Sequence, residues 1–295
     1  MSRGLRCLLL ASALLWLTSA VPAQSGPAPR IKVFVSVLPQ TYLAEQVGGR
    51  RISVETLVQP GESPVTYAPS PKQMVRLAEA DLFFRAGVPF ENVLMPKIES
   101  SFRDLRVVDT RRGIPLLTHH EEDEHDHGGA EEGPDPHVWL SPPLALKMAE
   151  NMLNALVAAD PPGKPEYEAN FTRLAHDLEA LHRRLTEVLA PVRGKKIFVF
   201  HPAFGYFCEA YGLEQMAIES GGREPSPRQL ARLIEAARAE DVRVIFVQPQ
   251  FSSRSAASVA RAIDGAVVAI DPLARDYLRN LSEMAAVVKS ALTGG

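Results

Sequence analysis

Short apolar, β-branched runs alternate with amphipathic segments along most of the chain. The apolar runs predict buried strands, and the segments between them repeat apolar residues three and four positions apart, which predicts helices. We expect strands at 31–39, 52–61, 81–87, 105–110, 196–200, 242–250 and 266–271. We expect helices at 41–49, 70–80, 89–101, 141–160, 165–192, 203–212, 226–241, 252–265 and 273–292. Such alternation is typical of α/β folds with mostly parallel sheets.

Local signals sharpen several of these boundaries. Gly48 and Gly49 predict a helix end. Ser70 is a suitable N-cap, with Pro71 at the first helical position. Pro96 falls inside the segment 89–101, where it predicts a kink or an end of that helix.

The segment 165–192 is unusually long for a helix in the middle of a chain. About 28 residues at 1.5 Å per residue give a helix near 40 Å long. The strand–helix alternation stops before this helix and resumes after it. We therefore predict two α/β lobes joined by one rigid helix, with a ligand site in the cleft between them.

The beginning of the chain resembles a secretory signal peptide. Arg3 and Arg6 precede an apolar run at 7–17, and small residues follow at 18–23. This layout predicts cleavage after Ala20 or Ala23, and an uncleaved N-terminal anchor is the alternative. After cleavage the chain keeps Cys208 as its single cysteine, which is expected in the core, so stability depends on core burial without an internal disulfide.

The formal net charge is −3, and 46% of the residues are hydrophobic, as in a globular protein. The sequence shows no stripe of basic residues, so nucleic acid is not an expected partner.

Five of the eight histidines fall between residues 119 and 137. The acidic run that contains His119, His120, His125 and His127 has the composition of a solvated, disordered segment. Its histidines and neighbouring carboxylates also suit loose metal capture and delivery. Disorder of this segment is compatible with metal capture. His176 and His182 lie on the polar side of the long helix and are expected at the surface.

Three other residues lie where predicted strands meet helices. His137 stands in "DPHVWLSP", His201 follows the strand 196–200, and Asp271 ends the strand 266–271. Each has an ordinary structural explanation: a packed histidine, a capping histidine and a helix N-cap. Since ligands bind at the carboxyl ends of parallel strands, the three can also meet in the interlobe cleft. Two imidazoles and a carboxylate form a ligand set that suits zinc.

Over residues 30 to 290 the chain resembles the zinc and manganese substrate-binding proteins of bacterial ABC importers, the cluster A-I family. The resemblance is carried by "GESPVTYAPSPKQMVRLAEADLFFRAG" at 61–87, "DPHVWLSP" at 135–142, the long helix, "FHPAFGYF" at 200–207 and "AIDPLA" at 269–274. The family fold has two α/β lobes, one long helix and a metal in the cleft.

The resemblance implies four metal-binding positions, of which three correspond to His137, His201 and Asp271. A histidine at the third position and a His-rich loop before the second are typical of the zinc members. The first position departs from the family pattern, because Val65 stands where a histidine is usual. Water is the first candidate for the missing ligand, and a histidine of the loop 119–127, Glu62 and Tyr67 are others.

The resemblance therefore implies a periplasmic, non-enzymatic receptor that captures Zn(II) and delivers it to an inner-membrane ABC permease. Its expected domains are a signal peptide (1–23), an N-terminal lobe (30–163) with the His- and acid-rich loop 119–133, a connecting helix (164–192) and a C-terminal lobe (193–295). We expect a monomer. Alternatives are a receptor for manganese or a metal chelate, an exported metallohydrolase, and a sequestering or adhesion protein without a permease.

Overall fold

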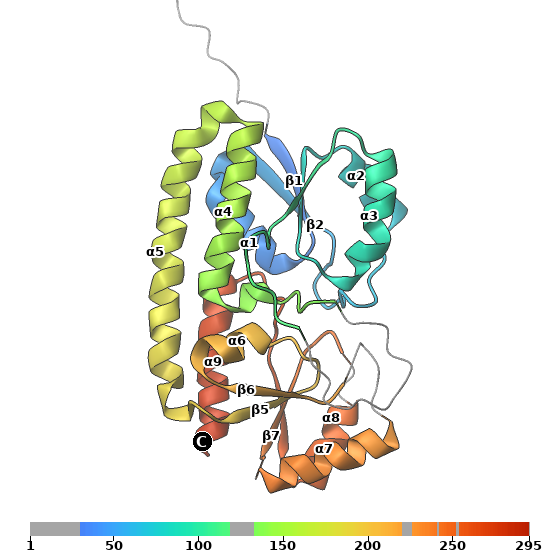
Figure 1. Ribbon diagram of the computed structural model, residues 1–295, viewed down its shortest axis with the longest axis vertical. Helices are drawn as coiled ribbons and strands as arrows, with labels where there is room; N and C mark the ends of the chain where they lie inside the picture. The colour runs from blue at the N-terminus through green and yellow to red at the C-terminus, as the bar shows by residue number, and fades with distance from the viewer. Residues whose placement is uncertain (1–29, 119–132, 220–225, 241, 252–253, 295) are drawn as a thin grey trace, which may run out of the picture.

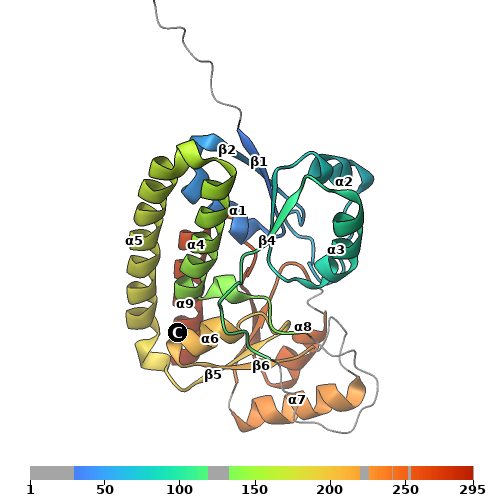
Figure 2. The ribbon, with the colours of Figure 1, turned by 45° about the horizontal axis from the view of Figure 1, so that its top comes forward.

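A computed structural model describes residues 30–118, 133–219, 226–240, 242–251 and 254–294 (Figure 1). These residues form two parallel sheets, each covered by helices, with one long helix along the side of both (Figures 1 and 2). The predicted α/β fold with two lobes and a long connecting helix is confirmed. None of the helices in the described part combines the length and hydropathy that a membrane span requires.

The first lobe is built on a four-stranded parallel sheet in the order β2-β1-β3-β4. Its strands are β1 (Ile31–Val35), β2 (Ile52–Thr56), β3 (Leu82–Arg85) and β4 (Arg106–Asp109). Its helices are α1 (Leu38–Gly48), α2 (Pro71–Ala78), α3 (Pro89–Ser101) and α4 (Pro142–Ala159), with 3₁₀ turns η1 (Gly49–Arg51) and η2 (Val138–Leu140). The apolar residues of β1 and β3 are buried except for the partly buried Ile31, as expected for central strands of a parallel sheet.

The second lobe repeats this arrangement in the order β6-β5-β7-β8, again with parallel pairing. Its strands are β5 (Lys196–Val199), β6 (Glu214–Ala217), β7 (Val244–Val247) and β8 (Ala266–Ala269). Its helices are α6 (Gly205–Tyr211), α7 (Pro227–Ala239), α8 (Arg254–Ala262) and α9 (Tyr277–Thr293).

The long helix is α5 (Lys164–Leu189), preceded by the 3₁₀ turn η3 (Pro161–Gly163) and followed by η4 (Ala190–Val192), which contains Pro191. It packs against α1 and α4 of the first lobe and against α9 of the second (Figure 2). Its buried leucines recur three or four residues apart, at 174, 178, 181, 185 and 189. This single apolar stripe buries one face of α5 along both lobes, so the helix holds them at a fixed spacing.

Capping residues fix the starts of two exposed helices. Ser70 Oγ accepts a hydrogen bond from the Gln73 backbone N–H at 3.3 Å, as predicted for a cap before Pro71. Ser226 and Gln229 form the same reciprocal pair before α7.

The structure departs from the sequence predictions at several places. β1 ends at Val35, because Pro39 lies in the first turn of α1 instead of closing the strand. α3 continues through Pro96 to Ser101, so Pro96 does not end this helix. The short edge strand β6 was not predicted, since four residues of mixed polarity give no clear periodicity.

Buried hydrogen bonds of Trp139 join the first lobe to the second beside the cleft. Trp139 of η2 donates its indole N–H to the Pro272 carbonyl oxygen at 2.8 Å. Tyr277 at the start of α9 donates its hydroxyl hydrogen to the Trp139 carbonyl oxygen. The Tyr277 ring also stacks on Tyr42 of α1, with centroids 5.6 Å apart. These contacts fix the segment after His137 against the segment after Asp271.

We predict that Tyr277→Phe lowers the free energy of unfolding by about 1–3 kcal/mol, because it leaves the buried Trp139 carbonyl without its donor. Urea denaturation followed by circular dichroism measures the change. Tyr42→Phe is the matched control, since the described residues offer its hydroxyl no hydrogen bond. An equal, small effect of both substitutions contradicts the prediction.

Candidate metal site

His137 is held by the aspartate two residues before it. Asp135 Oδ1 accepts a hydrogen bond from His137 Nδ1 at 2.7 Å and from the His137 backbone N–H at 2.8 Å. The Asp135 side chain is fully buried, and that of His137 is 12% exposed. The Tyr206 hydroxyl donates to the Asp135 backbone carbonyl, which ties this segment to α6. His137 therefore has a fixed ring orientation.

His201 is held in a similar way at the carboxyl end of β5. Its Nδ1 contacts a carboxylate oxygen of Glu219, a residue whose side chain is almost fully buried. The side chain of Gln248 accepts from the His201 backbone N–H and donates to the His201 carbonyl. The ring of Phe251 stacks on the imidazole, with centroids 4.6 Å apart. His201 is consequently fixed through its ring and its backbone.

The carboxylates also decide which nitrogen each histidine presents. An ionised carboxylate only accepts hydrogen bonds, so each Nδ1 carries the hydrogen and each Nε2 keeps its lone pair. A histidine that ligates a metal commonly donates its other N–H to a carboxylate in this way. Asp135 and Glu219 thus prepare both imidazoles to bind a cation through Nε2.

The two imidazoles lie close enough to share one ion. Their ring centroids are 5.3 Å apart and the ring planes cross at 78°. Two imidazoles on one tetrahedral zinc, with Zn–N distances of about 2.0–2.1 Å, have centroids roughly 5 Å apart. The observed spacing fits this geometry.

Burial keeps His201 in the neutral form that binds metals. Removal from water lowers the pKa of His201 below its ordinary value, and the nearby His137 acts in the same direction. The Glu219 carboxylate opposes this shift but has the smaller effect. At neutral pH the Nε2 lone pair of His201 is therefore available.

A small cavity of about 20 Å³ lies beside the two histidines. This volume accommodates a single ion or water molecule. Val65 lines the same cavity, together with Pro64 of its loop and Val88 and Pro89 at the start of α3. Val65, where the resemblance implies a histidine, thus lines one cavity with His137 and His201 and contributes only an apolar side chain.

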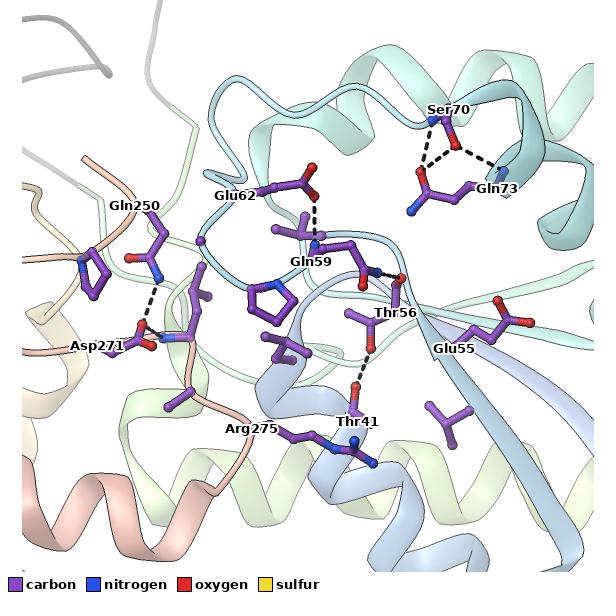
Figure 3. Close-up of a pocket in the computed structure, with 18 of the residues that line it drawn as sticks. Thr41, Glu55, Thr56, Gln59, Glu62, Ser70, Gln73, Gln250, Asp271 and Arg275 are labelled. Atoms are coloured by element: carbon purple, nitrogen blue, oxygen red, sulfur yellow. Dashed lines mark hydrogen bonds between the residues drawn. The ribbon is translucent and has the colours of Figure 1, made fainter. Parts of the chain in front are cut away.

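Asp271 does not line this cavity, although Pro272 and Leu273 do, and its side chain contacts other partners. Its Oδ1 accepts hydrogen bonds from Gln250 Nε2 at 2.8 Å and from the Leu273 backbone N–H at 2.9 Å (Figure 3). It is not a helix N-cap, because α9 begins only at Tyr277. Within the described ranges, no three His, Cys, Asp or Glu side chains are grouped closely enough to hold a metal. The structure thus brings together His137 and His201, whereas Asp271 lines the larger cleft and not the small cavity.

The other candidate ligands have different surroundings. Glu62 lines a larger cleft of about 860 Å³ that also borders Asp271, and its Oε2 accepts from the Gln59 backbone N–H (Figure 3). Tyr67 donates its hydroxyl hydrogen to the Leu57 carbonyl at 2.6 Å and lines neither cavity. The predicted auxiliary residues of the acidic loop lie outside the described residues; they are His119, His120, His125 and His127.

Two further predictions concern residues outside the site. His176 is exposed on α5, as predicted, whereas His182 is partly buried and contacts the Tyr211 hydroxyl. Cys208 is buried in the core, as predicted, and burial raises the pKa of its thiol.

Sequence reasoning missed the groups that orient the histidines. Asp135 lies within the motif "DPHVWLSP", two residues before His137, so the sequence alone places a carboxylate close to this histidine. Glu219 lies 18 residues after His201 and reaches it only because β6 pairs with β5. Gln248 and Gln250 follow β7, at the same edge of the sheet.

We predict that neutral His137 and His201 both carry their hydrogen on Nδ1, whereas exposed His176 averages between its two tautomers. Long-range ¹H–¹⁵N correlation spectra of the metal-free protein measure this directly. Asp135→Asn is expected to disturb the His137 tautomer and leave that of His201 unchanged. Hydrogen on Nε2 of both rings in the unmodified chain would rule out the orientation described above.

Comparison with known proteins agrees with this geometry. The family model described as "Zinc-uptake complex component A periplasmic" matches residues 33–291. A zinc-binding lipoprotein, AdcA of Streptococcus pneumoniae, is 30% identical over 274 residues, which cover 90% of this chain and 54% of AdcA. The chain thus spans about half the length of that relative. A manganese-binding lipoprotein, MntA of Halalkalibacterium halodurans, is 29% identical over 232 residues, 77% of this chain and 73% of MntA.

The fold comparison is consistent with these relatives. A crystal structure of ZnuA superimposes with a TM-score of 0.82 and 33% sequence identity, covering 89% of this chain and 99% of that one. The match extends over both lobes and the long helix. The chain belongs to the ZnuA family of periplasmic zinc-uptake components.

Proposed function

We propose that this protein is the substrate-binding component of a metal ABC importer, which captures Zn(II) between its lobes and delivers it to a permease of the inner membrane. The observation that supports this most strongly is the pair of histidines, each oriented by a buried carboxylate toward an ion-sized cavity. Family membership supports the same role.

His137 and His201 are the proposed core of the zinc site, with Asp271 as a third ligand. Asp271 Oδ1 is held by Gln250 and Leu273, so Oδ2 is the oxygen that Asp271 would supply to the metal. Because the ligands come from both lobes, the bound metal links the lobes as α5 and Trp139 already do. A permease that recognises the two lobes linked by the bound metal distinguishes loaded from empty receptors.

The proposed location is the periplasm. The family description supports it, and the signal-peptide pattern at 1–23 agrees with export, although that segment lies outside the described residues. We propose that the protein works there as a monomer, with 30–163 and 193–295 as its two lobes.

A receptor for manganese or for a metal chelate is the second candidate. The missing histidine at Val65 and the similarity to MntA favour it, since fewer nitrogen ligands reduce the preference for zinc. An exported metallohydrolase has less support. Glu219, the carboxylate closest to His201, contacts the imidazole Nδ1 instead of standing free as a general base.

We predict that His201→Ala and His137→Ala each weaken zinc binding by a hundred-fold or more, because each removes one of the few strong ligands. Isothermal titration calorimetry of the mature chain measures the affinity. His176→Ala removes an exposed histidine and is expected to leave the tight site unchanged. Tight zinc binding that survives both substitutions contradicts the proposal.

Deletion of residues 119–129 tests the contribution of the acidic loop. We predict that the shortened protein keeps one tight zinc site, because the cleft ligands all lie outside the deleted segment. Calorimetry with the intact protein run in parallel gives the comparison, and any loss is expected among weaker additional sites. Disappearance of the tight site would show that a loop histidine takes the position that Val65 leaves open.

A further inference from the structure

The wall of the small cavity contains three polar side chains. They are His137, His201 and Gln250, and the other seven lining residues are proline, valine, phenylalanine or leucine. Two of the three polar side chains are proposed zinc ligands. Gln250 is the third and has so far been described only as a partner of Asp271.

The orientation of the Gln250 amide is fixed by that partner. Asp271 Oδ1 accepts hydrogen bonds, so Gln250 must turn its NH₂ group toward it and its carbonyl oxygen away. This oxygen, Oε1, is buried and accepts no hydrogen bond from the residues that the structure describes. A buried acceptor without a donor is costly and calls for an explanation, such as an ion that it coordinates.

Gln250 also stands where the site lacks a ligand. Val65 lines the same cavity and cannot coordinate a metal, which leaves His137, His201 and Asp271 as a set of three. Gln250 borders this small cavity. It also lines the larger cleft together with Asp271 (Figure 3). Neither Glu62 nor Tyr67 lines the small cavity, so Gln250 is better placed than they are.

We propose that Gln250 is a metal ligand, which supplies its amide oxygen Oε1 to the cation held by His137 and His201. It thereby provides the fourth ligand that Val65 cannot supply. This inference rests on the proposed function of the cleft as a metal site. An amide oxygen is a harder ligand than imidazole, so it suits Mn²⁺ better and reduces discrimination against that ion. The natural site then has two nitrogen and two oxygen ligands.

The alternative role for Gln250 is to position Asp271 through their hydrogen bond. Two substitutions separate the roles. Gln250→Leu removes both the oxygen and the N–H donor, and so weakens binding in either case. Gln250→Glu keeps an oxygen, adds a charge that attracts a cation and removes the donor. A ligand role therefore predicts zinc binding at least as tight as in the unmodified protein, whereas a positioning role predicts weaker binding.

The test is calorimetric titration of the full mature chain with zinc, and separately with manganese. We expect Gln250→Leu to weaken zinc binding by about ten-fold or more, comparable to losses seen around other metal sites, and to weaken manganese binding further. Gln250→Glu is expected to match or exceed the unmodified affinity. Adding Val65→His to Gln250→Leu is expected to restore zinc affinity but not manganese affinity. Gln46→Leu, on the exposed face of α1, is the matched control.

Two results would overturn the assignment: an unchanged zinc affinity in Gln250→Leu, or a loss in Gln250→Glu equal to that in Gln250→Leu. Failure of the proposed metal-binding function would give a different result. In that case the unmodified chain itself binds zinc weakly, or the His201→Ala variant still binds zinc tightly.

Discussion

The contact of each histidine with a buried carboxylate is the interaction on which the site depends. Asp135 and Glu219 hold the hydrogen on Nδ1 of His137 and His201, which leaves each Nε2 free to bind a metal. Neither carboxylate is itself a proposed ligand. Their burial makes the contact strong and the orientation fixed, so the binding nitrogens are placed before a cation arrives.

The rest of the fold maintains this arrangement across two lobes. His137 belongs to the first lobe, between β4 and α4, and His201 follows β5 of the second. Their separation therefore depends on how the lobes are joined. α5 packs against helices of both lobes, while Trp139 and Tyr277 connect them next to the site. These contacts hold His137 and His201 in place across the two lobes.

Much of the fold could be predicted from the sequence because its signals are local. Apolar runs mark the central strands, and the leucine spacing of α5 marks one long buried face. The site was less predictable. His137, His201 and Asp271 lie at element junctions, yet only tertiary structure brings the two histidines within 5.3 Å and turns Asp271 toward Gln250. Glu219 was missed because the edge strand β6 that brings it close to His201 has no periodic pattern.

Diffraction from crystals of the zinc-loaded protein, measured at the zinc absorption edge, tests the central claim most directly. The account predicts one strong anomalous peak between the Nε2 atoms of His137 and His201, at about 2.0–2.1 Å from each. A principal peak elsewhere in the cleft, for example beside Glu62 and away from both imidazoles, would contradict it.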